Sequence, residues 1–83
     1  MSERDQMLGR LSVLEQERHR LTMRMCGLCG AIRQAINPTL IEVYEMDIAM
    51  AAQQMDDLVM AQAELMGANS KIERLRRELG LHG

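Results

Sequence analysis

Two cysteines, Cys26 and Cys29, form the part of this sequence best suited to chemistry. Two thiolates at this C-x-x-C spacing can bind zinc or cycle through a disulfide. A structural zinc site needs four ligands, so one pair suffices only if a symmetric dimer places two pairs on its axis. A redox pair normally opens a helix beside a strand, whereas this pair interrupts a helical periodicity. We therefore expect no metal and no cofactor, and keep a metal- or thiol-dependent protein as an alternative.

Small residues surround the two cysteines and suggest a packing role instead. Gly27, Gly30 and Ala31 would let a second helix approach this segment closely. Each glycine costs a helix about 1 kcal/mol relative to alanine. Since that cost needs a compensating gain, we expect a patch of small residues that serves helix packing.

Basic side chains form two clusters that could bind nucleic acid. The clusters consist of Arg18, His19, Arg20 and Arg24, and of Lys71, Arg74, Arg76 and Arg77. No aromatic residue accompanies them to stack on bases, and acidic residues are interleaved with both. A solvated helix face with ion pairs is the plainer interpretation, so nucleic-acid binding is kept as a second alternative.

The elements that must position these residues are two long segments separated by Pro38, the only proline. In each segment a stripe of mainly apolar residues repeats in alternating steps of three and four, which is typical of helices packed at a shallow angle. The first stripe consists of Arg4, Met7, Leu11, Leu14, Arg18, Leu21, Met25, Leu28, Ile32 and Ala35. The second consists of Ile41, Tyr44, Ile48, Ala51, Met55, Leu58, Gln62, Leu65, Asn69, Ile72, Arg76 and Leu79. The pattern predicts helices over about 3–35 and 38–79.

Asn37 and Pro38 predict the turn between these helices, at 36–38. Asn37 is a preferred helix N-cap, and proline is favoured at the first helical position. Ile36 and Ile41 then suit a hydrophobic staple around the cap. Proline also disfavours the helical conformation at the residue before it, so the first helix should stop there. The two stripes are out of phase across this point, as a turn requires.

The predicted fold is therefore all-α, a single domain over 1–83. It is an antiparallel two-helix hairpin of the coiled-coil kind, and a long bent helix in an intertwined dimer is the alternative. Antiparallel pairing of the stripes places Leu11 opposite Leu65. In this register Leu75 and Leu79 extend beyond the first helix, so we expect another subunit to cover them.

Polar residues occupy some positions within the apolar stripes, among them Arg18, Gln62 and Asn69. A polar residue at such a position typically sets the register and the oligomer state at some loss of stability. We expect these three to act in that way.

The composition indicates self-association. The chain has 83 residues, including nine Met and no Phe or Trp, so one hairpin buries little surface. The second helix is apolar on more than one side, which indicates more than one neighbour. The expected interface residues are Met46, Met50, Ala52, Val59, Met60, Met66, Leu75 and Leu79. We expect a dimer or tetramer that forms a four-helix bundle, with a methionine-rich surface for another helical protein as the alternative.

Charge is segregated along the chain, although the formal net charge is only −2. Residues 1–37 carry six Arg and four acidic residues, and 71–83 carry four basic and two acidic residues. Residues 38–70 carry six acidic residues and no Lys or Arg. A fold at the proline brings this acidic middle against the arginine-rich first helix, which favours the hairpin.

These observations favour a non-enzymatic, cytoplasmic interaction or assembly protein. Too few His, Asp, Glu and Lys stand at stripe positions to build a catalytic cleft. No run of about 18 apolar residues could span a membrane, and the N-terminus lacks the layout of a signal peptide. In layout the chain resembles many small bacterial helical hairpins, among them secretion co-chaperones and phage accessory proteins.

Overall fold

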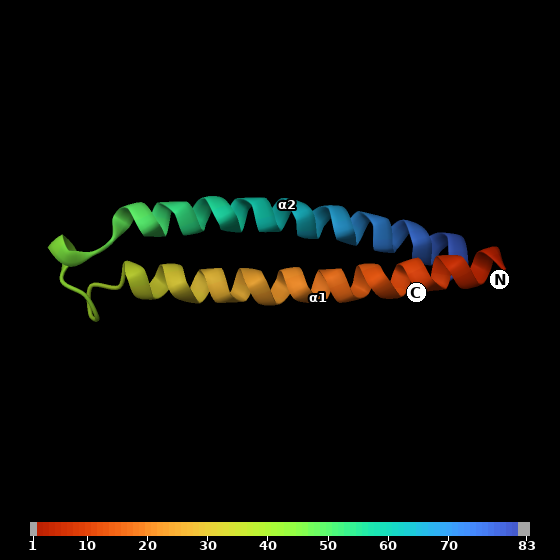
Figure 1. Ribbon diagram of the computed structural model, residues 1–83, viewed down its shortest axis with the longest axis horizontal. Helices are drawn as coiled ribbons and strands as arrows, with labels where there is room; N and C mark the ends of the chain where they lie inside the picture. The colour runs from red at the N-terminus through yellow and green to blue at the C-terminus, as the bar shows by residue number, and fades with distance from the viewer. Residues whose placement is uncertain (1, 82–83) are drawn as a thin grey trace.

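Two long helices packed side by side make up the fold, as the computed structural model of residues 2–81 shows (Figure 1). Helix α1 spans Glu3–Ala35 and helix α2 spans Ile48–Leu79, with the short 3-10 helix η1, Val43–Glu45, between them. The chain folds back on itself as an antiparallel hairpin with extents of 60 × 20 × 17 Å. The predicted all-α class and helical hairpin are confirmed, and the bent single helix is not formed.

Helix α1 has the bounds that the stripe predicts. Ser2 is its N-cap, and the Ser2 Oγ accepts a hydrogen bond from the Asp5 backbone N–H at 3.1 Å. Glu3 and Asp5 place negative charge in the first turn, where the helix dipole favours it. The helix ends at Ala35, shortly before Pro38, because proline disfavours helix at the residue before it.

The predicted start of the second helix at residue 38 is wrong. The Asn37 Oδ1 accepts hydrogen bonds from the N–H and the hydroxyl of Thr39, and the Asn37 carbonyl accepts from the N–H groups of Leu40 and Ile41. This single turn is not continued. Helix α2 begins at Ile48, with Asp47 as N-cap.

A competition between two caps explains this difference. The Asp47 Oδ1 accepts from the Met50 N–H at 2.9 Å, so Asp47 caps as well as Asn37 would. After Asn37 come Ile41, Val43 and Tyr44, which are weaker helix formers than the Ala, Met and Gln residues that follow Asp47. Helix therefore forms after the second cap, and 36–47 become a connection rather than a tight turn.

The longer connection moves the register by one heptad. Leu11 packs in a cluster with Ile72, Leu75 and Leu79, where Leu65 was predicted. At the end of the hairpin the Arg4 Nη1 donates to the Leu79 carbonyl at 3.3 Å. Leu75 and Leu79 are thus buried within the chain, and the expectation that another subunit must cover them loses its basis.

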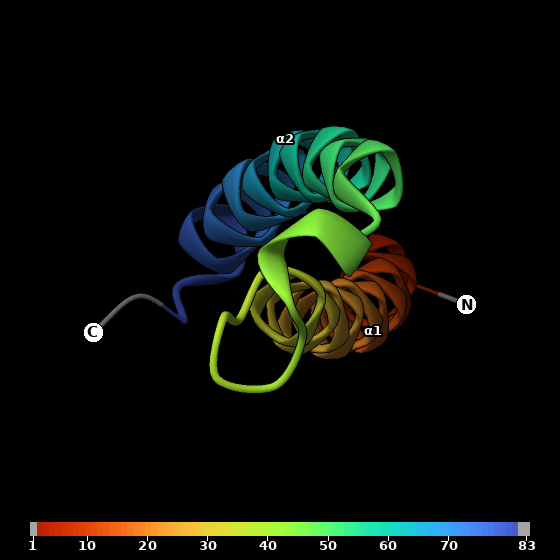
Figure 2. The same cartoon turned by 90° about the vertical axis from the view of Figure 1, so that its left-hand side faces the viewer.

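The stripe of α2 also differs from the predicted one at every second position. The residues of α2 that are buried or half-buried along the contact are Ala51, Gln54, Leu58, Ala61, Leu65, Ala68, Ile72, Leu75 and Leu79, which we call the core stripe. Met55 and Gln62, predicted to lie inside, are exposed instead. Leu21 of α1 and Ala61 of α2 are both 2 % exposed, so a large and a small residue are each buried in the contact. Figure 2, seen from the end that carries the connection, shows α2 inclined across α1.

Truncation of a core side chain tests this register. Ile72 is 1 % exposed, and Ile72→Ala should lower the free energy of unfolding by about 2–5 kcal/mol through lost apolar contact and the cavity left behind. Urea unfolding followed by circular dichroism measures the effect.

The matched control is Met23→Ala, since Met23 is 59 % exposed on α1. It should change stability by less than about 0.5 kcal/mol. Equal losses for the two variants would contradict the observed core.

Candidate interaction surface

Cys26 and Cys29 are both free and exposed on α1. His19, two turns earlier on the same helix, is also exposed. Within residues 2–81 no group of three or more His, Cys, Asp and Glu side chains lies close enough together to hold a metal ion. Residues 2–81 therefore bring no further ligand to the cysteine pair.

The small-residue patch beside the cysteines is open. A Cβ added at Gly27 or Gly30 would meet no heavy atom within 4 Å. The hairpin itself therefore does not need glycine at either position. If a close helix contact justifies these glycines, it lies outside the single hairpin.

Alanine substitution tests that patch. Gly27→Ala should raise the free energy of unfolding by about 1 kcal/mol, because alanine loses less conformational entropy in a helix and meets no atom here. Gly80→Ala is the opposite control, since Gly80 caps α2 at φ 74° in the left-handed region. Thermal melts compare the two. A loss of stability for Gly27→Ala would show that another helix packs on the patch.

The polar residues predicted to set the register are not buried. Arg18 and Asn69 are half-buried and Gln62 is exposed. The ion pairs found among residues 2–81 join Arg20 to Glu17 and Arg76 to Glu15, and neither includes Arg18. The predicted register-setting role thus has no buried polar contact behind it.

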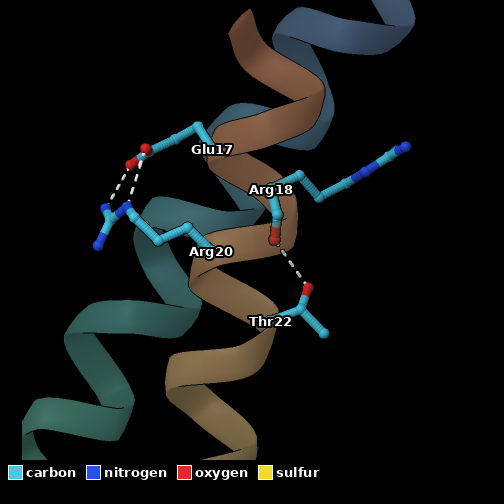
Figure 3. A network of polar contacts seen from close by, with 4 residues as sticks. All are labelled: Glu17, Arg18, Arg20 and Thr22. Atoms are coloured by element: carbon cyan, nitrogen blue, oxygen red, sulfur yellow. Dashed lines mark hydrogen bonds and ion pairs between the residues drawn. The ribbon is translucent and has the colours of Figure 1, made fainter. Parts of the chain in front are cut away.

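Figure 3 shows the surroundings of Arg18. Its side chain extends away from the Glu17–Arg20 pair, and its carbonyl accepts a hydrogen bond from the Thr22 hydroxyl at 2.8 Å. Hydrogen bonds from Arg20 hold the pKa of the Glu17 carboxyl below its ordinary value, and the same contact raises the pKa of Arg20. This pair is exposed on the helix surface, where water screens it and its contribution is small.

Gln54 is the polar residue that the core stripe does contain. Its Oε1 is shielded from solvent and accepts no hydrogen bond from the described residues. A shielded acceptor without a donor costs about 1–3 kcal/mol. The sequence pattern missed Gln54 because it placed Met55, one residue later, inside.

Replacement of this amide should stabilise the hairpin. Gln54→Leu removes the unpaired oxygen and adds apolar contact, so the free energy of unfolding should rise by about 1 kcal/mol. The control is Gln53→Leu, because Gln53 is exposed and donates to Asp57 at 3.2 Å. Urea unfolding should show no gain for the control. A loss for Gln54→Leu would mean that the amide finds a partner.

Exposed apolar side chains cover a second side of α2. Ile48, Ala52, Met55, Val59 and Met66 follow one another at helical spacing, and we call them the outer stripe. All five are exposed, with Val59 at 61 % and Met66 at 64 %. An apolar face of this length on a soluble helix usually meets another surface.

The other predicted interface residues are divided among three environments. Met50 and Met60 are exposed on the opposite side of the core stripe, and Met46 is half-buried in the connection. Leu75 and Leu79 belong to the intramolecular core. Five of the eight predicted side chains, Met50, Ala52, Val59, Met60 and Met66, are therefore exposed.

The connection adds an apolar end to the hairpin that the sequence pattern did not predict. Leu40, Val43 and Tyr44 are exposed there, with Tyr44 at 83 %. Tyr44 was assigned to the helix contact because helix was expected from residue 38. The acidic residues Glu42 and Glu45 accompany these side chains on the surface.

Neither helix, over residues 2–81, is long and apolar enough to cross a membrane. The sequence matches no protein family, and no curated protein or solved structure is similar to it. The geometry of the hairpin and its exposed apolar side chains is thus what bears on function.

Proposed function

We propose that this chain is a non-enzymatic helical interaction protein that self-associates through the outer stripe of α2. Two hairpins that pair through this stripe would form a four-helix bundle. The observation that supports the proposal is the row of exposed apolar residues, Ile48, Ala52, Met55, Val59 and Met66, which lies beside the core stripe and is not covered by α1.

The energetics favour burial of this row. Full burial of a side chain such as Val or Met contributes about 1.5–3 kcal/mol. Between Ile48 and Met66 the row is interrupted by one polar residue, Gln62. Flexible methionine side chains also adapt to different neighbours, so an adaptor role toward another helical protein uses the same surface.

Light scattering across a dilution series, with circular dichroism on the same samples, tests the proposal. The unmodified chain should form an oligomer whose helicity falls as it dissociates. The double variant Val59→Gln, Met66→Gln should weaken association at least about tenfold, because two apolar side chains are lost from the centre of the contact.

The double variant Val13→Gln, Met23→Gln serves as the control, because these exposed apolar residues lie on α1. It should leave association through the outer stripe unchanged. Equal weakening by both double variants, or a helical monomer for the unmodified chain, would contradict self-association through the outer stripe. A helical monomer would direct the search to a heterologous partner.

A further inference from the structure

One side of the hairpin, away from the outer stripe, carries a groove between the helices near their free ends. Gly9, Val13 and Leu14 of α1 line it, and its volume is about 680 Å³. Arg10 and Lys71 also line it, one from each helix. The wall of the groove is apolar, and the two basic side chains line it with their aliphatic stems.

A second groove lies near the connection, with a volume of about 370 Å³, and Ala31 and Met50 are among its lining residues. Positions 10 and 31 of α1 are three heptads apart, and so are positions 50 and 71 of α2. Residues separated by whole heptads occupy equivalent positions in a coiled coil. The two grooves therefore lie on the same side of the hairpin, which we call the grooved side.

The charges at the two grooves are opposite. Arg10, Lys71 and Arg74 stand at the groove near the free ends, and one acidic residue, Glu78, lines its continuation along α2. Glu45 and Asp47 line the groove near the connection. The grooved side therefore carries net positive charge near the free ends and negative charge near the connection.

We propose that a second copy of this chain covers the grooved side, turned end for end. The acidic groove of each copy then lies over the basic groove of the other. This contact rests on the proposed capacity for self-association but uses a different side of α2 from the outer stripe. A side-by-side arrangement in the same direction would bring like charges together at both ends, which disfavours it.

Apolar groups accompany the charges in this arrangement. Met50 is exposed at the acidic groove, and Leu40 and Val43 are exposed on the adjoining connection. The end-for-end pairing brings these side chains to the apolar wall formed by Gly9 and Val13 of the second copy.

A second copy fits better than a foreign helix for a reason of symmetry. A two-fold axis makes one surface contact itself, so a surface with opposite charges at its two ends satisfies both ends at once. The net charge of only −2 also lets two copies approach without strong repulsion.

The test uses a background in which association through the outer stripe is weakened, the double variant Val59→Gln, Met66→Gln. Light scattering should still detect a dimer in this background. Adding Lys71→Glu and Arg74→Glu should weaken that dimer at least about tenfold by placing acid over acid. Adding Glu45→Lys instead should also weaken it, and an equal mixture of the two charge variants should restore it. Asp47 is left unchanged because it caps α2.

Spin labels measure the direction of the pair. In the same background, with Cys26→Ser and Cys29→Ser, a label at Thr39→Cys sits on the connection. Pulsed electron resonance should give a separation above about 40 Å for end-for-end copies, given a rise of about 1.5 Å per helical residue. Copies in the same direction would place the labels within about 25 Å.

The outcomes separate the two proposals. Three results would overturn the end-for-end contact: a monomer in the double-variant background, a short label separation, or a dimer whose stability does not change on charge reversal. Each would leave the outer stripe proposal intact. Association of the unmodified chain that ignores Val59→Gln, Met66→Gln but responds to charge reversal would overturn the outer stripe alone.

Discussion

The small size of the alanines on α2 is the constraint on which the rest of the structure depends. Ala51, Ala61 and Ala68 are buried on α2, and larger residues such as Leu21 and Ile32 are buried on α1. Alternation of large and small side chains fills the space between two helices that run close together. A core built in this way is one layer thick, and it has no room for the other large apolar residues of α2. The methionines and Val59 on the other sides of α2 are therefore left exposed.

Much of the fold was predictable because heptad spacing is a strong signal over long segments. The bounds of α1, the antiparallel hairpin and the end of α2 before Gly80 all follow from periodicity and capping. The start of α2 does not, since Asn37 and Asp47 are both competent caps and the choice depends on the helix propensity of the intervening residues. The phase of the α2 stripe was ambiguous because α2 is apolar on more than one side. The pattern through Met55 and the pattern through Gln54 share every seventh position.

The exposed apolar surface of α2 was also predictable from the heptad spacing. The prediction was wrong where it depended on the phase and register of α2. Val59 and Met66 belong neither to the predicted contact stripe of α2 nor to its core stripe, so their exposure did not depend on the register. Leu75 did depend on it, and a shift of one heptad moved this residue from a predicted intersubunit contact into the core. The pairing of the two grooves could not be derived from sequence, because it requires knowing which residues of α1 and α2 lie side by side.

The cluster of Leu11, Ile72, Leu75 and Leu79 lies far from the connection, and this placement bears on how the chain folds. The nearby contact of Arg4 with Leu79 joins residues 75 positions apart. Closing so long a loop costs conformational entropy before any contact rewards it. A hairpin whose best-packed contacts are next to its turn can close progressively from that turn, like a zipper. In this hairpin the best-packed contacts join the two free ends. The unfolding transition is therefore expected to be cooperative, and local opening should start at the connection.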